Sequence, residues 1–134
     1  MALGRGSDGD AAGDQLFSIE RIQGSNLADD NLYGSAVFNV LEGYGGNDYM
    51  DGRAGNDHLS GGAGDDVIVG GAGNDQLLGG LGDDTAVYSG NAADYDVSLN
   101  VDGSYTVRDL RGIDGVDRLV SVHTLQFLDS SILI

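Results

Sequence analysis

Five aspartates recur every nine residues in the middle of the chain: Asp48, Asp57, Asp66, Asp75 and Asp84. Carboxylates at fixed intervals among glycines suit a hard cation, because Asp oxygens and backbone carbonyls together give the roughly six ligands at about 2.3–2.6 Å that Ca²⁺ prefers. Mg²⁺ demands a stricter octahedron, and zinc favours His or Cys. The spacing therefore predicts calcium sites.

The charge of the whole chain agrees with a cation as its partner. The 134 residues include 22 acids against 6 basic residues, for a net charge of −16. This charge argues against binding nucleic acid or an anionic membrane surface, whereas a bound cation would relieve the self-repulsion. Since the chain has no cysteine, it can form neither a disulfide nor a thiolate metal site.

The aspartates belong to five consecutive nonapeptides that run from Gly43 to Val87. Their sequences are GYGGNDYMD, GRAGNDHLS, GGAGDDVIV, GGAGNDQLL and GGLGDDTAV. Gly always fills the first and fourth positions, Asp the sixth, and an apolar residue the eighth. Glycines permit the positive φ angles of tight turns, and the last three residues alternate as a half-buried strand does. Each unit therefore predicts a six-residue turn and a three-residue strand, with only the eighth side chain in the core.

Two such units make one full coil, so alternate turns stack about 4.8 Å apart along each edge. This stacking predicts one row with Asp48, Asp66 and Asp84 and a second row with Asp57 and Asp75. Carboxylates about 5 Å apart repel by roughly 1 kcal/mol in water and by more at lower dielectric. A cation between them is needed for the rows to form.

The five units resemble the G-G-x-G-x-D-x-U-x nonapeptides of the repeats-in-toxin (RTX) hemolysin-type family, and depart from that pattern at Tyr44 and Arg53. The resemblance implies an all-β fold, a parallel β-roll, with a calcium ion between neighbouring turns of the same edge. It implies about three core sites, between Asp48 and Asp66, Asp66 and Asp84, and Asp57 and Asp75. Besides these five aspartates, the predicted metal-site residues are turn glycines, fifth-position residues and two lead-in residues: Gly43, Gly45, Asn47, Gly52, Gly55, Asn56, Gly62, Gly64, Asp65, Gly71, Gly73, Asn74, Gly80, Gly82, Asp83, Asp30 and Asn39.

Residues 1–42 carry the same period in degraded form and are predicted to be lead-in coils with extra, weaker sites. SNLADDNLY (25–33) places Asp30 and Leu32 in register, and GSAVFNVLE (34–42) does so for Asn39 and Leu41. GDAAGDQLF (9–17) also fits, with Asp14 and Leu16, and Ile19 and Ile22 are predicted to point inward in a longer, irregular coil.

From residue 88 onward the nine-residue period gives way to alternation. The pattern predicts a hairpin of 95–99 and 105–110 around Asp102-Gly103, and further strands at 118–122 and 124–128. Residues 88–134 are therefore predicted to cap the open end of the roll. The segment 129–134 resembles C-terminal signals of type I secretion, while the start lacks the apolar core of a secretory signal and no stretch is long enough to span a membrane.

The outer face of units one, three and five becomes apolar towards its C-terminal end, at Val67, Val69 and Val87. A solvated sheet face is expected to stay polar. We therefore predict that the hairpin, or the segment 125–134, packs over these valines.

Catalysis has few candidate residues. His58 and His123 form no H-E-x-x-H motif, and the chain lacks a G-x-S-x-G elbow, an EF-hand loop and a P-loop lysine. The acid pairs Asp65/Asp66 and Asp83/Asp84 fit a calcium turn better than a glycosidase.

Three function classes remain. The favoured one is a non-enzymatic, calcium-binding module of a larger exported bacterial protein, which folds on Ca²⁺ outside the cell and whose partners include the type I secretion machinery. The second is a calcium-dependent module that binds a polysaccharide or cell surface, as in epimerases and adhesins. The third is a disordered acidic linker, which the regular apolar eighth position argues against.

Overall fold

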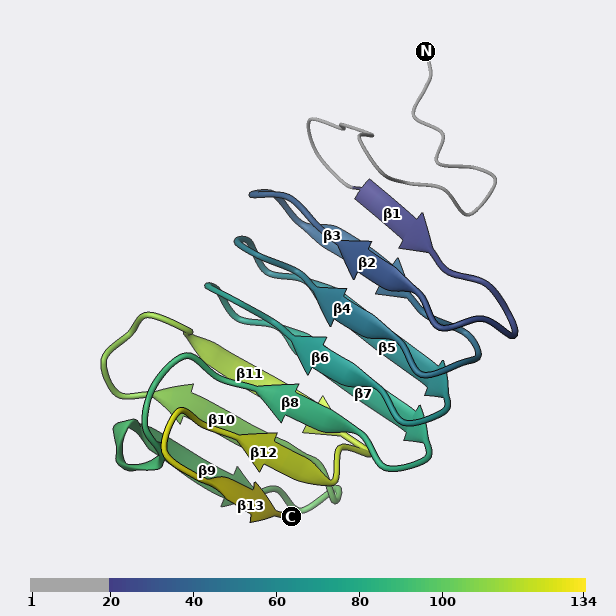
Figure 1. Ribbon diagram of the computed structural model, residues 1–134. Helices are drawn as coiled ribbons and strands as arrows, with labels where there is room; N and C mark the ends of the chain where they lie inside the picture. Colours follow the sequence, from purple (N-terminus) through teal and green to yellow (C-terminus); the bar gives the residue numbers. More distant parts are fainter. Residues whose placement is uncertain (1–19) are drawn as a thin grey trace.

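The computed structural model describes residues 20–134, so the predictions for Asp14, Leu16 and Ile19 lie outside it. Two sheets face each other (Figure 1). The first has the strand order β1-β3-β5-β7-β11-β10-β9, and the second has the order β13-β12-β8-β6-β4-β2. The strands of the first sheet are β1 (Glu20–Gln23), β3 (Asn39–Glu42), β5 (His58–Ala63), β7 (Gln76–Leu81), β11 (Val116–Val120), β10 (Tyr105–Asp109) and β9 (Tyr95–Leu99). Those of the second are β13 (Ser131–Leu133), β12 (Thr124–Gln126), β8 (Thr85–Val87), β6 (Val67–Val69), β4 (Tyr49–Asp51) and β2 (Asn31–Tyr33).

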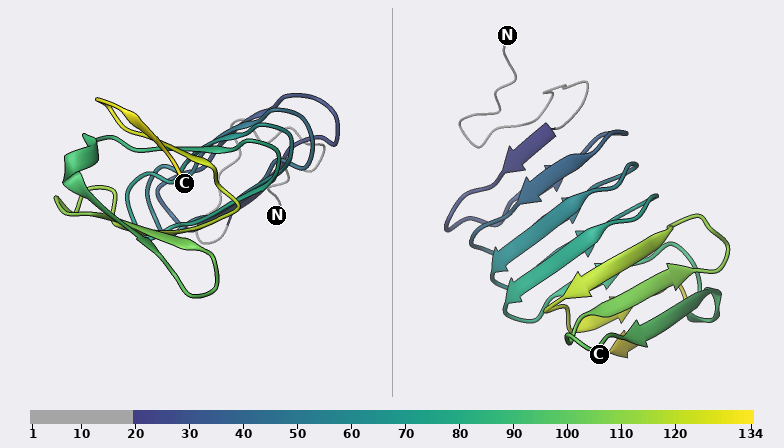
Figure 2. Two further views of the ribbon diagram at one scale, coloured as in Figure 1. Left: turned by 90° about the horizontal axis from the view of Figure 1, so that it is seen from below. Right: turned by 180° about the vertical axis from the view of Figure 1, so that it is seen from behind.

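Successive nonapeptides alternate between the two sheets, so that two units complete one coil. Strands of neighbouring coils pair in parallel, each residue with the one at the same place in the next coil, as Leu59 with Leu77 and Met50 with Ile68. Seen along the stack, the coils lie over one another (Figure 2). The predicted parallel β-roll is confirmed, because the strands of the regular repeats pair in parallel with strands of the coils before and after them.

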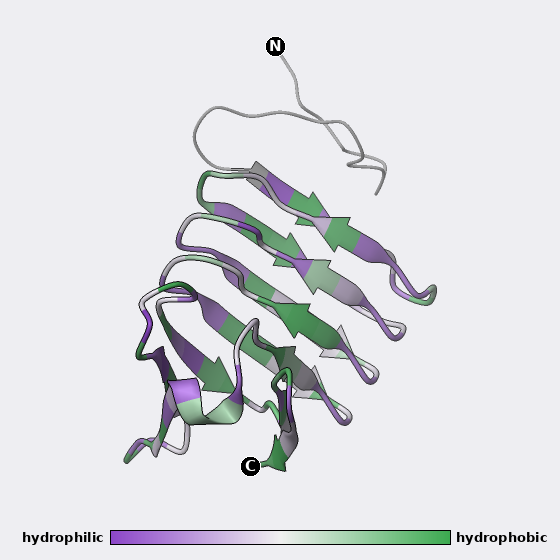
Figure 3. Cartoon of the chain, turned by 60° about the vertical axis from the view of Figure 1, so that its left-hand side comes forward, coloured by the Kyte–Doolittle hydropathy of each residue, from purple (hydrophilic) through white to green (hydrophobic). Residues whose placement is uncertain are grey.

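Through the regular repeats, the core is a single stack of eighth-position side chains between the two sheets. Met50, Leu59, Ile68, Leu77 and Ala86 are fully buried. Their neighbours at positions seven and nine are half-buried on the outer faces, as the alternation predicts. Hydrophobic residues alternate with hydrophilic ones along the strands, and the turns are mostly hydrophilic (Figure 3).

The lead-in continues the same path with a small irregularity. Leu32 and Leu41 are buried in register with the core, and so is Ile22. β1 pairs with β3 through Ile22 and Leu41, which lie slightly further apart in sequence than the paired residues of the later coils. The turn before β2 is therefore longer than a regular turn, in agreement with an irregular coil there.

The segment after β8 first leaves the roll and then rejoins it. A short 3-10 helix, η1 (Ala92–Asp94), leads into the predicted hairpin of β9 and β10. The chain then returns as β11, which pairs in parallel with β7, and as β12, which pairs in parallel with β8. Strand β13 was not predicted; it pairs antiparallel with β12. Residues 88–134 thus add a further coil to the stack and a hairpin at its edge.

The predicted packing over Val67, Val69 and Val87 is wrong. The hairpin extends the other sheet edge to edge through β11, and β12 and β13 extend the edge of the sheet that contains these valines. The three valines keep partial exposure on the outer face. The open backbone edges of the last coil need hydrogen-bond partners, and strand addition satisfies them where a strand laid on the face would not.

Candidate metal centre

The sixth-position aspartates lie at the ends of the turns and point inward. Asp48, Asp57, Asp66, Asp75 and Asp84 are all at most 3% exposed. Each uses its Oδ1 to accept a hydrogen bond from the backbone N–H of the sixth-position residue one coil earlier. For example, the Asp48 N–H donates to Asp66 at 2.8 Å and the Asp57 N–H donates to Asp75 at 2.7 Å. The rows predicted from the nine-residue spacing are therefore present.

The second carboxylate oxygen of each of these aspartates has no partner among residues 20–134. The buried, unpaired carboxylate atoms are the Oδ2 atoms of Asp48, Asp57, Asp66, Asp75, Asp84 and Asp117. Leaving a buried acceptor unpaired costs about 1–3 kcal/mol, and more for a charged group. Two rows of such atoms indicate a site built for a positively charged ligand.

The first-position glycines leave room beside these oxygens. A Cβ placed on Gly43 would clash with Oδ2 of Asp48 and with the carbonyl oxygen of Gly61 in the next coil. The same holds at Gly52 and Gly61. Each of these turns therefore brings a carboxylate oxygen and a backbone carbonyl oxygen of the next coil to one small space, which only glycine leaves free.

Burial opposes the charge of these carboxyls. It raises the pKa of Asp48 and Asp84 to about 6, that of Asp57 to about 7 and that of Asp75 to about 8. The pKa of Asp66 is raised by the same cause. A cation bound at the site would offset this penalty by stabilising the ionised form.

The fifth-position residues form a second ladder, which the spacing did not predict. Their side-chain oxygens accept the N–H of the fifth-position residue one coil later, as Asn47 does from Asp65 and Asp65 from Asp83, at 2.8 and 2.9 Å. Asn56 accepts in the same way from Asn74. These side chains lie on the exposed side of the turns, and their role as metal ligands stays a prediction.

The turn backbone is left-handed at the second and fourth positions of the nonapeptide. Gly62, Gly71 and Gly80 at the second position have φ between 89° and 101°. Tyr44 and Arg53 replace this glycine in units one and two, yet they keep φ at 72° and 70°. The departures from the family pattern therefore leave the shape of the turn unchanged at this position.

The lead-in coil fills its turns with protein atoms instead. Oδ2 of Asp30 accepts the N–H and the hydroxyl of Ser25, at 2.6 and 3.0 Å. Asn39, a neutral residue at the sixth position, accepts the Ser35 N–H at 2.7 Å. These two turns therefore lack the unpaired carboxylate oxygen that marks the regular repeats, while the predicted extra, weaker sites there stay a prediction.

A further aspartate, Asp117, belongs to the second row and was missed. The sequence GIDGVDRLV at 112–120 has Gly, Gly, Asp and Leu at positions one, four, six and eight, a signal that could have identified it. Asp117 is 1% exposed, and its Oδ1 accepts the Asp75 N–H at 2.9 Å. The hairpin inserted before it hid the periodicity.

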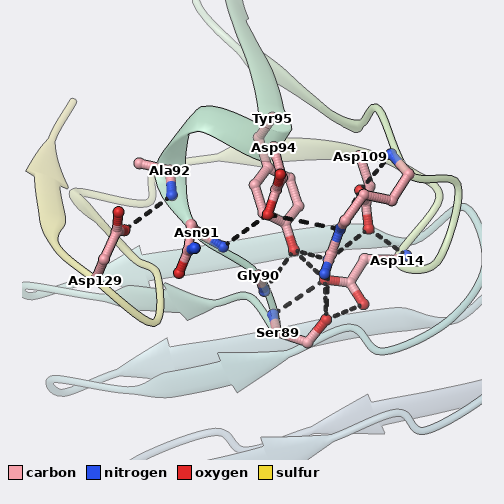
Figure 4. Close-up of polar contacts among 10 residues, drawn as sticks. Ser89, Gly90, Asn91, Ala92, Asp94, Tyr95, Asp109, Asp114 and Asp129 are labelled. Carbon is pink, nitrogen blue, oxygen red and sulfur yellow. Dashed lines mark hydrogen bonds and ion pairs between the residues drawn. The ribbon is translucent and has the colours of Figure 1, made fainter.

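The base of this insertion is held by a polar network (Figure 4). Arg111 pairs with Asp109 at 2.8 Å and donates to the Tyr95 hydroxyl at 2.8 Å. Asp114 accepts from both the backbone N–H and the hydroxyl of Ser89. Arg111 lowers the pKa of Asp109 to about 2. The network ties the start of the insertion to its end.

The donor set fits Ca²⁺. Within residues 20–134, no three His, Cys, Asp or Glu side chains gather closely enough to hold a metal alone. Backbone carbonyls must complete any such site, and a set of carboxylate and carbonyl oxygens without nitrogen or sulfur suits calcium rather than zinc. Asp48, Asp66 and Asp84 would hold ions along one edge, and Asp57 and Asp75 along the other.

Comparisons with known proteins agree with this geometry. The RTX calcium-binding nonapeptide repeat matches residues 25–59 and 51–86, with 4 copies. No curated protein matches the chain. In the part of the chain that the structure describes, no helix has the length and apolar character of a membrane span. Since the match covers the regular coils and the five repeat aspartates, residues 25–86 of this chain belong to the RTX calcium-binding nonapeptide repeat family.

Proposed function

We propose that the chain is a non-enzymatic module that folds when Ca²⁺ fills its turns, and that it supports the folding and secretion of a larger exported protein. One observation carries the calcium-dependent folding: the buried Oδ2 atoms of the five repeat aspartates and of Asp117 have no partner within residues 20–134. Without a cation, the cost of burying these carboxylates opposes folding. With a cation, the same atoms become ligands, and binding adds to the free energy of folding.

Export fits the affinity expected of such a module. Extracellular calcium modules bind with Kd values of about 10⁻⁴–10⁻³ M, well above cytosolic calcium levels. The chain would therefore stay unfolded inside a cell and fold outside it. The terminal segment 129–134, with its acidic residue and apolar end, supports recognition by type I secretion machinery.

Calcium binding itself is tested by titration calorimetry of the whole chain with Ca²⁺ and, in parallel, with Mg²⁺. We expect about three or more Ca²⁺ per chain and much weaker binding of Mg²⁺, which requires a stricter octahedron. A chain that binds neither ion, or Mg²⁺ as well as Ca²⁺, would contradict the proposal. The export role is tested by co-expressing the chain with a type I secretion apparatus, with and without residues 129–134, and measuring the exported fraction.

A second candidate function is supported by a groove of about 930 Å³ on the outer face of the first sheet. Polar side chains that line it include His58, Ser60, Gln76 and Arg118, and Asp57 and Asp75 of the metal row adjoin it. Such a lining offers hydrogen bonds to a polysaccharide, and calcium in the adjoining row would order it. Affinity electrophoresis in gels with neutral or acidic polysaccharides, with and without Ca²⁺, tests this candidate; unchanged mobility in every gel would exclude it.

A further inference from the structure

We propose that a calcium site forms between Asp75 and Asp117, across a nonapeptide that the hairpin insertion splits in two, and that this ion fixes residues 88–134 onto the roll. The proposal rests on the proposed function, because it assumes that cations occupy the aspartate rows. It goes further by assigning a site that joins the regular repeats to the segment after them.

At its strand end, the split unit has the same backbone contacts as an intact one. In the intact coil, the Gln76 N–H donates to the Asp57 carbonyl at 2.8 Å; in the split coil, the Arg118 N–H donates to the Asp75 carbonyl at 2.9 Å. Strand β11 pairs with β7 through Arg118 and Gln76, just as β7 pairs with β5 through Gln76 and His58. The split turn differs in the hairpin inserted within it and in two residues, with Tyr88 in place of the first-position glycine and Val116 in place of the fifth-position Asn or Asp.

The side-chain contacts of the turn are also reproduced. Val116 at the fifth position donates its N–H to Asn74 at 2.9 Å, as Asn74 does to Asn56 in the coil before. Gly115 at the fourth position has φ of 78°, and a Cβ on it would clash with the Gly73 carbonyl oxygen. In the intact turn, a Cβ on Gly73 would meet the carbonyl oxygen one coil earlier in the same way. The split turn is therefore equivalent to a calcium turn from its fourth position onward.

Two buried, unpaired oxygens face this coil. Asp75 and Asp117 are 3% and 1% exposed, and within residues 20–134 the Oδ2 atom of each lacks a hydrogen-bond partner. The other buried acids of the insertion differ. Asp109 pairs with Arg111, and Asp114 accepts from Ser89 and Tyr95. An unpaired carboxylate oxygen is thus a property of the sixth position and not of the insertion in general.

Along the path of the roll, Tyr88 takes the place of the first-position glycine, one coil after Gly70. Gly112, the first residue of the GIDGVDRLV match, does not, because a Cβ on it would meet no atom within 4 Å. Its ring is buried and stacks on Phe127, with centroids 5.8 Å apart. Among the parts of the chain that the structure describes, its hydroxyl too has no partner. The pKa of Tyr88 is raised first by burial and next by the negative charge of Asp117. The split turn therefore adds a neutral oxygen beside Asp117. An oxygen-only set with two carboxylates suits Ca²⁺.

The two rows end differently. On the first edge, only residues 121–123 separate β11 from β12, so this turn is too short for a sixth-position aspartate and the row stops at Asp84. On the second edge, the row runs Asp57, Asp75, Asp117. The inferred site gives the second row two inter-turn sites, as many as the first row has.

The test compares Asp117→Asn with Asp114→Asn by calcium titration calorimetry and equilibrium dialysis on the full chain. Asp114 is the matched control, because it is a buried acid of the same segment whose oxygens already have protein partners. Asp117→Asn should bind one Ca²⁺ fewer than the unaltered chain, and Asp114→Asn should bind the same number. Circular dichroism at saturating Ca²⁺ checks that each variant is folded.

A folded Asp117→Asn chain that binds as many ions as the unaltered chain would overturn the site and leave the proposed function intact. An unaltered chain that binds no Ca²⁺ would overturn both. If Asp117→Asn does not fold, amide hydrogen exchange of the unaltered chain decides the question. Equal gains in protection at the Gln76 and Arg118 amides with rising Ca²⁺ support the site, whereas protection at Gln76 without Arg118 contradicts it.

Discussion

The lead-in coil and the regular repeats follow the same path but differ in how the carboxylate oxygens of their turns are paired. In the turn that ends at Asp30, the Ser25 N–H and hydroxyl saturate the outer carboxylate oxygen. In the turn that ends at Asp66, the equivalent oxygen is buried without a partner from residues 20–134. The first arrangement is complete without a ligand. The second is complete only with one.

This difference indicates that the residues of each turn determine whether that turn depends on calcium. A serine in the turn closes the site with protein atoms, and a neutral Asn39 removes the charge altogether. Glycine with Asp leaves the site open and charged. The coil geometry is common to both, since Leu32 and Leu41 continue the core stack into the lead-in. The lead-in can therefore act as a coil that needs no ion, next to coils that do.

The largest expected effect is on pH dependence, because all the regular turns contribute together. In the ion-free chain, burial raises the pKa of Asp57 and Asp117 to about 7 and that of Asp75 to about 8, against about 3.9 in the unfolded chain. The folded state then binds more protons than the unfolded state between pH 4 and pH 8. The stability from these groups is fully present below about pH 4 and is lost as the pH rises through about 6–8.

In a chelator, the chain should therefore contain more β-structure at pH 5 than at pH 8, as measured by circular dichroism and by urea unfolding. Asp109, whose pKa is lowered to about 2, has the opposite sign but acts only below about pH 4. With Ca²⁺ present, the chain should instead contain more β-structure at pH 8 than at pH 5, because protons compete with the ion for the carboxylates. The Ca²⁺ concentration at the midpoint of the titration should therefore rise as the pH falls from 8 to 6. An ion-free chain that is more stable at pH 8 would contradict the account.

A smaller effect separates individual turns. Asp66 is shared by two neighbouring turns of its row, so Asp66→Ala should lose two ions, whereas Asp84→Ala should lose one. At calcium ten times above Kd, each lost site removes about 1.4 kcal/mol of stability. Asp30→Ala, in the lead-in, tests the weaker site predicted there: closure by Ser25 predicts no lost ion and a cost of only about 1 kcal/mol in hydrogen bonds, whereas the repeat pattern predicts the loss of one weakly bound ion.

Calorimetry measures the number of bound ions for the three variants, and urea unfolding at fixed Ca²⁺ measures their free energy of unfolding. Equal ion losses for Asp66→Ala and Asp84→Ala would rule out the stacked rows. Loss of an ion in Asp30→Ala would show that the serine-closed turn binds calcium after all, and so would break the comparison between the two regions.

The smallest effect sharpens the comparison by converting one kind of turn into the other. Ser35→Gly with Asn39→Asp gives the turn at 34–39 the glycine and carboxylate of a regular unit, one coil before Asp57. The double variant should bind one additional Ca²⁺, with lower affinity than the regular sites, because Val37 and Phe38 remain at the fourth and fifth positions. Asn39→Asp alone is the control and should bind the additional ion more weakly than the double variant, since it keeps the Ser35 hydroxyl, while the N–H at position 35 is common to both. An unchanged stoichiometry in the double variant would show that glycine and Asp are not sufficient.

The nine-residue spacing predicted the coils, the core stack and the two aspartate rows, because a strict period in sequence becomes a strict spacing in a solenoid. It failed where the period was broken. The unit that ends at Asp117 was missed because the hairpin separates its two halves. The hairpin or the segment 125–134 was predicted to cover the apolar outer face at Val67, Val69 and Val87, but the open strand edges at the end of the roll determine where these segments pair. The serine closure of the lead-in turns depends on side-chain geometry, which spacing does not give.

The central claim is that the regular turns need calcium to fold, and circular dichroism at neutral pH tests it most directly. The chain is first measured in EDTA and then with Ca²⁺ raised to millimolar levels. The account predicts a largely disordered spectrum in EDTA and a cooperative gain of β-structure as Ca²⁺ rises, with Mg²⁺ unable to replace it. A β-rich spectrum in EDTA that Ca²⁺ leaves unchanged would contradict it.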